Sequence, residues 1–273
     1  MNNTPYRKKA LVLLIVTIAL LATIAILGAV FAESAAVTDF SAKNQPPSWA
    51  HPFGTDWMGR DMLTRTIAGL SLSIRLGIVT ALCSAVIALV LGSAAAMGRA
   101  ADGAVSWLTD LTMGVPHILL LLLISFACGR GTVGVFVGIT LTHWMPLARV
   151  IRAEILQLRQ SGYVLAAQRL GVGAAQIART HMLPGVLPQF ITGTILLFPH
   201  VILHEASITF LGFGLPPETP AIGIILQESM RYLAVGDWWL AVFPGVLLVA
   251  IVLLFDAVGR SARRLADPYS AQR

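Results

Sequence analysis

Two histidines, His200 and His204, lie inside a long apolar run and are followed directly by Glu205. Residues four apart share one face of an α-helix. A neutral imidazole is a ligand for nickel, copper or zinc, and an ionisable side chain inside a membrane span is a functional candidate by default. Two interpretations stay open. The pair contacts a transported metal transiently, because a tight site would retain the ion, or it hydrogen-bonds neighbouring helices.

Motifs that would make the chain an enzyme are missing from the sequence. The three lysines, Lys8, Lys9 and Lys43, never follow a glycine, so there is no G-x-x-x-x-G-K-[ST] phosphate cradle. H-E-x-x-H and G-x-S-x-G are also absent. Cys83 and Cys128 form no C-x-x-C pair and behave as small apolar residues. We expect no catalytic residue. The alternative is an intramembrane enzyme built around His143, His200, His204 and Glu205.

The composition places these residues in a membrane. Of 273 residues, 56% are hydrophobic and 12% are charged, and the mean hydropathy is +0.79. A soluble domain carries roughly 25% charged residues. Six runs come close to the ~20 apolar residues that a membrane-spanning helix needs. They predict an all-α polytopic membrane protein, one domain over 1–273, with spans at about 10–32, 76–98, 111–129, 131–148, 189–213 and 238–256.

The basic residues predict the orientation of these spans. Cytoplasmic segments are enriched in Lys and Arg, and thirteen of the 19 such residues fall on one side when the N-terminus is placed inside. Both termini are therefore expected in the cytoplasm. Outer segments are expected at 33–70 and 214–237, and an inner loop at 149–188. The net charge of +6 is assigned to this topology and not to nucleic-acid binding.

The inner loop has a local pattern of its own. Residues 163–170 favour a short helix that Gly171 can end. Residues 174–183 favour a second helix, which is expected to stop at Pro184 because proline interrupts helical hydrogen bonding. The small residues Ala166-Ala167 leave room for another surface. The pattern predicts a compact knob on the cytoplasmic face that a partner protein can approach closely.

The outer segment contains a conspicuously polar stretch at residues 51–65. Either member of Thr55-Asp56 can cap a helix start. Oppositely charged residues at i,i+4 spacing contribute only ~0.2–0.5 kcal/mol per pair, and they occur here twice, as Asp56 with Arg60 and as Asp61 with Arg65. The stretch therefore predicts a surface helix that leads into the second span.

The inner loop resembles the E-A-A-x3-G-x9-I-x-L-P loop of bacterial ABC importer permeases. The spacing fits without a gap, with Leu165 at the acidic position and His181 at the isoleucine position. In that family the loop docks into a cleft of the cytoplasmic ATPase and transmits its closure. The resemblance implies that the ATPase-coupling residues are Leu165, Ala166, Ala167, Gly171, Arg179, His181, Leu183 and Pro184.

The outer stretch resembles the H-P-x-G-T-D-x-x-G-R-D hallmark of the dipeptide, oligopeptide and nickel permeases. The matching residues are Gly54, Thr55, Asp56, Gly59, Arg60 and Asp61. Further matches at 210–214, 243–245 and 265–268 extend the resemblance over nearly the whole chain. It implies a second, C-type permease subunit of a type I importer in the bacterial inner membrane. The implied partners are an unlike permease, two ATPases that bind ATP and magnesium, and an extracytoplasmic solute-binding protein; this subunit would hold no cofactor.

The histidines resemble the nickel branch of these permeases. That branch carries H-x-x-x-H where this chain has His200 and His204, and a His-Trp pair where it has His143 and Trp144. The expected cargo is nickel or another transition metal, free or chelated, moved by alternating access. Di- or oligopeptides are the alternative cargo, and a proton-driven carrier is a further rival. The substrate pathway is expected to include His143, Trp144, His200, His204 and Glu205.

Overall fold

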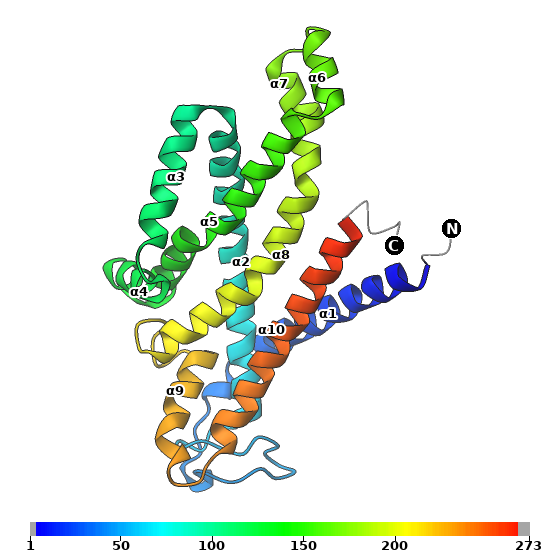
Figure 1. Cartoon of the computed structure of the whole chain (residues 1–273). Coiled ribbons are helices and arrows are strands. Elements are labelled where there is room, and N and C mark those ends of the chain that lie inside the picture. The colour runs from blue at the N-terminus through cyan, green and yellow to red at the C-terminus, as the bar shows by residue number, and fades with distance from the viewer. Residues whose placement is uncertain (1–3, 267–273) are drawn as a thin grey trace.

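A computed structural model describes residues 4–266, which form helices bundled around α2, α5 and α8 (Figure 1). Over these residues there is no strand, so the all-α prediction is confirmed. The family match at 265–268 lies partly outside the described residues. The helices are α1 (Thr4–Val30), η1 (Ser34–Ala36), η2 (Phe40–Ala42), α2 (Met62–Met97), α3 (Arg99–Met113), α4 (His117–Ala127), α5 (Gly131–Arg159), α6 (Gly162–Arg169), α7 (Ala174–Ile177), η3 (Ala178–Met182), α8 (Leu183–Phe210), α9 (Ile222–Leu233) and α10 (Trp239–Ala266).

Five helices, α1, α2, α5, α8 and α10, are long and apolar enough to cross a membrane. The expected straight span at 111–129 is not observed. Its residues are divided between α3 and α4, which are bent by 96° at a short break and count as a sixth span if the pair crosses as one. Pro116 explains the break, because proline lacks the N–H of a helical hydrogen bond and disfavours helix in the residue before it.

Ion pairs hold α3, the helix before the break, against α5. Asp102 accepts from Arg152 at 2.5 Å, and Asp110 accepts from Arg149 at 2.9 Å. Three of the four side chains are at least one-third exposed and the fourth nearly so, so each pair stabilises the contact only modestly. The pairs nevertheless favour the observed course of α3, which runs back along the bundle before the chain bends into α4.

Several helices are longer than the apolar runs predicted. α2 has 36 residues, and at 1.5 Å per residue it is ~54 Å long, well beyond the ~30 Å hydrocarbon layer. It begins before the run at 76 because Asp61 caps it, and it carries Arg65 in buried ion pairs and Arg75 on an exposed face. α5 extends to Arg159 and α8 begins at Leu183, so both ends of the predicted inner loop are helical. Pro184 does not stop a helix; it lies in the first turn of α8, directly after the π-helical turn η3 that leads into it.

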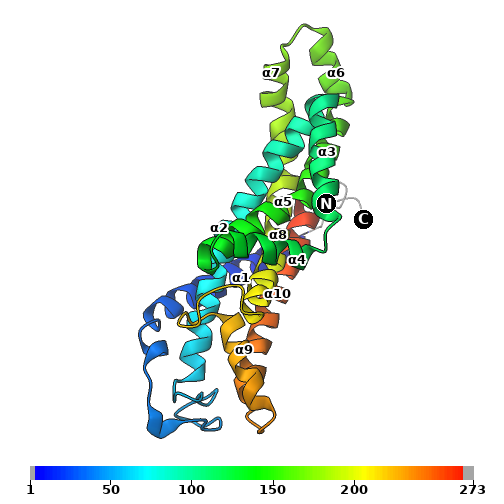
Figure 2. The same ribbon diagram turned by 90° about the vertical axis from the view of Figure 1, so that its left-hand side faces the viewer.

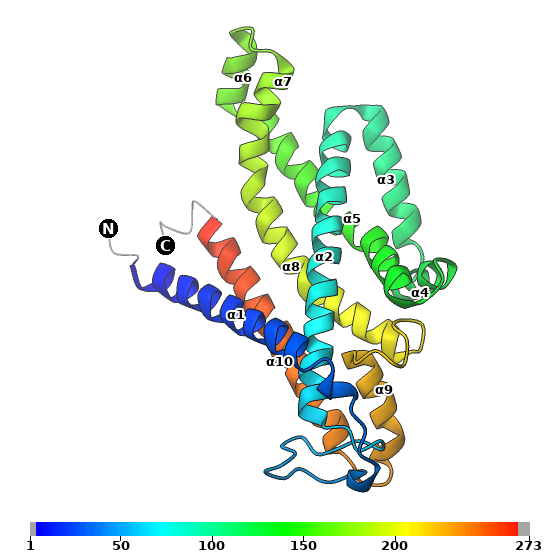
Figure 3. The ribbon, with the colours of Figure 1, turned by 180° about the vertical axis from the view of Figure 1, so that it is seen from behind.

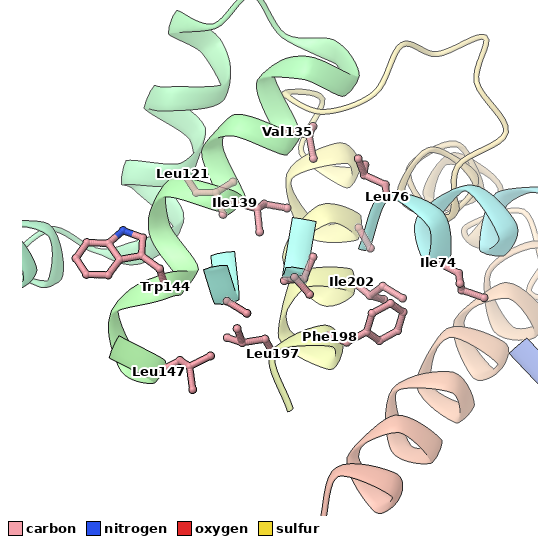
Figure 4. Close-up of a cluster of buried hydrophobic side chains, with 14 of the residues drawn as sticks. Ile74, Leu76, Leu121, Val135, Ile139, Trp144, Leu147, Leu197, Phe198 and Ile202 are labelled. Atoms are coloured by element: carbon pink, nitrogen blue, oxygen red, sulfur yellow. The ribbon is translucent and has the colours of Figure 1, made fainter. Parts of the chain in front are cut away.

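Small residues let the central helices approach closely. Gly134 and Gly138 of α5 lie against α4, where an added Cβ would come within 2.5 Å of the Ser125 carbonyl and 3.3 Å of the Leu121 carbonyl, respectively. Their G-x-x-x-G spacing therefore serves helix packing. Between α2, α4, α5 and α8 the core is filled by branched and aromatic side chains, which include Ile74, Leu121, Ile139, Phe198 and Ile202 (Figure 4).

The molecule is elongated, with the α6–α7 hairpin at one end and α9 with the segment before α2 at the other (Figure 2). α1 packs along α2 and α10 on the outside of the bundle. The start of α1 and the end of α10 both lie toward the α6–α7 end (Figure 3). The two ends of the molecule therefore carry the inner loop and the outer stretch that the sequence singled out.

Candidate functional site

A cavity of about 410 Å³ opens between α4, α5 and α8. Apolar side chains such as Met145 and Leu197 form much of its wall. Its polar lining comprises His117, Thr142, His143, Gln189, Thr192, His200, His204 and Arg263. Lipid offers no hydrogen bonds to such groups, so the cavity is suited to water, solute or another protein surface.

Three histidine rings meet at this cavity, each from a different helix. His117 opens α4, His143 lies in α5 and His204 lies in α8. Their ring centroids are 4.7–4.9 Å apart and the rings meet edge to face. One ligand nitrogen from each residue lies within 4.8 Å of the other two. The cluster brings together a set of donors that suits a transition-metal ion.

Backbone carbonyls orient two of these rings. His143 Nδ1 lies 3.0 Å from the Ile139 carbonyl oxygen, and His204 Nδ1 lies 2.8 Å from the His200 carbonyl oxygen. Because a carbonyl oxygen can only accept, each Nδ1 carries the proton and each Nε2 keeps its lone pair. Metal-binding histidines are commonly oriented by this kind of bond.

The structure places only some of the predicted pathway residues at the cavity. His143, His200 and His204 line it, but His200 is exposed and lies outside the three-histidine cluster. Trp144 is 3% exposed and does not line the cavity. Its ring points away from the side chains of Ile139 and Leu197 (Figure 4). Glu205 is fully buried beside α2, where it accepts hydrogen bonds from Ser73 at 2.6 Å and Thr209 at 3.1 Å.

His117 was missed from the sequence. It lies in the same apolar run as the predicted third span and has no partner at helical spacing. The one available signal was its position directly after Pro116, since proline marks a break where a side chain can leave the helix surface. Sequence spacing shows i,i+4 pairs on one helix, whereas the cluster joins three helices.

A second polar cluster lies at the α9 end of the molecule. Asp56 is 2% exposed and accepts from Arg60 Nε at 2.7 Å and Arg65 at 2.8 Å. Glu228 of α9 completes the cluster by accepting from the same two arginines, at 3.3 and 2.7 Å. The predicted Asp56–Arg60 pair is therefore present. The predicted Asp61–Arg65 pair is wrong, because Arg65 turns toward Asp56 and Glu228.

Asp61 has a different role from the one its spacing predicted. Its carboxylate accepts from the Thr64 amide at 2.9 Å and caps α2, and it also pairs with His51 at 2.8 Å. Residues 51–61 form turns and no surface helix, since Gly54 and Gly59 adopt positive φ angles of 72° and 75°. Thr55 caps no helix; its hydroxyl donates to the Ala42 carbonyl at 2.5 Å and ties the segment to η2. Glu228 belongs to a segment that the sequence predicted only as an outer loop.

The α6–α7 hairpin forms the predicted knob. Gly171 has φ +81° between the two helices, and no atom would meet a Cβ there. Ala167 faces inward with Val164 and Ile177, which together make a small core of their own. The remaining predicted coupling residues split by exposure: His181 is half-buried against Tyr163, and the solvent-facing members are Leu165, Ala166, Gly171, Arg179, Leu183 and Pro184.

Residues 87–268 match the family described as the binding-protein-dependent transport system inner membrane component. The chain belongs to this family. It is a membrane-integral permease subunit of an ABC importer and is not itself an ATPase or another enzyme. Importers of this kind also contain ATPase, solute-binding and second permease components.

Relatives of this permease are named for peptide transport. A Brucella suis protein named as a peptide transport system permease is 35% identical over 231 residues, covering 85% of this chain and 78% of the relative. The dipeptide transport system permease of Bacillus subtilis is 30% identical over 227 residues, covering 83% and 71%. The fold resembles the inward-facing MetNI methionine ABC transporter, with TM-score 0.62, 21% identity and coverage of 76% and 98%. An amino acid ABC transporter with histidines gives TM-score 0.60, 16% identity and coverage of 74% and 94%.

Proposed function

We propose that this permease moves di- or oligopeptides across the inner membrane by alternating access. The observation that carries the proposal is the 35% identity to the Brucella suis peptide permease, which extends over 85% of the chain. Peptides were the alternative cargo suggested by the sequence, and the relatives favour them over nickel. The cavity between α4, α5 and α8 suits a peptide because its wall combines apolar contacts with amide, hydroxyl and imidazole groups.

The cavity is proposed to face a second, unlike permease subunit. Its polar side chains, among them Gln189, Thr192 and His204, would be costly against lipid in spans of this length. A partner permease placed over the cavity would enclose a path shared by both subunits. The polar side chains on this face support the arrangement.

The α6–α7 knob is proposed to face the cytoplasm and to dock on an ATPase subunit. The concentration of arginines at this end supports the orientation, since Arg149, Arg152 and Arg159 all lie on the same half of α5. The exposed residues Leu165 and Ala166 offer a flat apolar surface, and ATP and magnesium would be held by the partner. The end of the molecule with the Asp56 cluster would then face the solute-binding protein.

The test is uptake by cells that lack this subunit. We expect loss of accumulation of radiolabelled di- and tripeptides, restored by the plasmid-borne chain. Complementation by a Gly171→Glu variant should fail, because the strained loop would not couple to the ATPase. Unchanged peptide uptake in the deletion strain, with every other peptide importer removed, would contradict a peptide cargo.

Transition-metal import is a second candidate, and the three-histidine cluster is the observation that favours it. The same deletion strain distinguishes the two cargoes. Loss of nickel accumulation with normal peptide accumulation would indicate a metal importer. Loss of peptide accumulation alone would indicate a peptide importer.

A further inference from the structure

We propose that His117, His143 and His204 bind a divalent transition-metal ion at the wall of the cavity. A role for the ion as cargo would rest on the second candidate function, transition-metal import, whereas the binding itself does not. The site differs from the His200–His204 pair that the sequence suggested, since it draws one ligand from each of three helices. It lies on the wall of the cavity, where an ion can enter and leave.

The geometry is close to that of a bound ion. Metal–nitrogen bonds of about 2.0–2.1 Å place tetrahedral ligands roughly 3.3 Å apart. One ring nitrogen from each histidine lies within 4.8 Å of the other two. His143 Nε2 lies 3.4 Å from His204 Nδ1, so the His204 ring must turn to present its Nε2 to the ion. Side-chain rotations that bring the nitrogens closer by up to about 1.5 Å close the remaining gap. Because α4 begins at His117, that ring is attached to the end of a helix instead of its middle.

The protonation of the rings agrees with metal binding. The carbonyl oxygens of Ile139 and His200 hold the Nδ1 protons of His143 and His204, which leaves both Nε2 lone pairs available. Metal-binding histidines usually have such a second hydrogen bond. The His117 ring forms no hydrogen bond with the described part of the chain, so it is free to turn toward the ion.

The donor set indicates the class of ion that the site would hold. Three neutral imidazoles suit nickel, copper, cobalt or zinc and do not suit magnesium or calcium, which prefer oxygen ligands. The buried carboxylate of Glu205 accepts from Ser73 and Thr209 and is not among the grouped ligand atoms. Three protein ligands leave at least one coordination position for water or a chelating cargo.

Equilibrium binding to the full chain in detergent tests the proposal without ATP, partners or transport. Titration with Ni²⁺ alone, followed by calorimetry, should give one saturable site per chain. Co²⁺ should give the visible absorption of an ion with nitrogen ligands. His117→Leu, His143→Leu and His204→Leu should each weaken Ni²⁺ binding at least tenfold. The matched control is His200→Leu, which removes a fourth histidine from the same cavity wall and should leave the affinity unchanged.

His117→Gln provides a second variant that keeps a polar group and places little demand on folding at the half-exposed start of α4. It should bind Ni²⁺ as weakly as His117→Leu while its elution volume and thermal unfolding stay normal. Wild-type affinity in either His117 variant, an equal loss in His200→Leu, or no saturable binding to the wild-type chain would overturn the site. A chain that binds no metal but still supports peptide uptake would refute this inference and leave the proposed function intact.

Discussion

Asp56 shows how a single carboxylate can organise an irregular segment. It accepts from the side chains of Arg60 and Arg65 and from the backbone amides of Met58 and Arg60. This ring of bonds turns the chain back so that Asp61 can cap α2. Nearby, the Ser41 hydroxyl and amide donate to Asp39 and hold the pKa of that carboxyl below its usual range. The segment is therefore ordered by polar contacts and has little apolar core.

Replacing Asp56 should destabilise the protein strongly. In Asp56→Asn, the two arginines would share the single remaining charge of Glu228. Removing one partner from a buried ion pair costs about 3 kcal/mol or more, which corresponds to a fall in Tm of roughly 6–12 °C. Thermal unfolding in detergent measures the effect. Glu218→Gln is the control, since Glu218 is an exposed acid at the same end of the molecule; an equal fall there would refute the role of the cluster.

At the scale of elements, the broken third span depends on how α4 lies against α5. Pro116 ends the helical path, and the close contact of Gly134 and Gly138 with α4 fixes where the chain goes next. That contact positions His117 beside His143. At the other end of α5, Gly171 allows α6 and α7 to fold back on each other. Gly134 and Gly138 are needed because a side chain would clash with α4, whereas Gly171 is needed because its φ angle is positive.

Gly134→Ala should separate α4 from α5. The added methyl would lie 2.5 Å from the Ser125 carbonyl oxygen, and overpacking of this kind costs about 1–3 kcal/mol. Gly103→Ala in α3 meets no atom and should instead stabilise its helix by about 0.5–1 kcal/mol. Thermal unfolding of the two variants therefore should shift in opposite directions. A stabilised Gly134→Ala variant would contradict the close packing of α4 on α5.

Gly171→Ala should weaken coupling without affecting membrane insertion. A side chain in the left-handed conformation costs roughly 1–2 kcal/mol, enough to reduce the population of the correct loop about fivefold or more. The measurement is solute uptake per ATP hydrolysed by the assembled importer in vesicles. Gly173→Ala is a matched control, because Gly173 has an ordinary φ of −62° and equally open surroundings. Similar losses in both variants would show that the strain at Gly171 is not the cause.

At the scale of the whole molecule, the two segments proposed to meet partner proteins lie far apart. The α6–α7 knob and the Asp56 cluster lie at opposite ends of an elongated bundle (Figure 2). α2 begins at the cluster and α5 ends at the knob, and these continuous helices of 36 and 29 residues pack along each other. A movement of the knob can therefore be transmitted along rigid elements past the cavity. This arrangement suits alternating access between the two sides of a membrane.

Cysteine labelling tests the orientation of the whole chain. In a background without Cys83 and Cys128, Trp49→Cys should react with an impermeant thiol reagent in intact cells. Gln176→Cys should react after the cells are permeabilised. Both positions are exposed, so a difference in labelling reports the side of the membrane and not burial. Labelling of Gln176→Cys in intact cells would invert the proposed topology.

The sequence by itself determined the features that depend on residues close together in the chain. Apolar runs predicted helices because a chain in lipid must satisfy its backbone hydrogen bonds internally. Gly171 and the small residues around it predicted the knob, and the spacing of Asp56 and Arg60 predicted one ion pair that is present. These properties follow from neighbours along the chain, so they can be predicted from the chain.

Only the tertiary structure decided which distant residues meet. Periodicity placed His200 and His204 together, but it carries no information on the direction in which α4 leaves Pro116, so His117 was missed. The same reason explains why Arg65 pairs with Glu228 from α9 and why Trp144 and Glu205 lie away from the cavity. A side chain's partners across a bundle depend on helix rotation and crossing. Those are fixed by packing among α2, α4, α5 and α8 and not by spacing within any one of them.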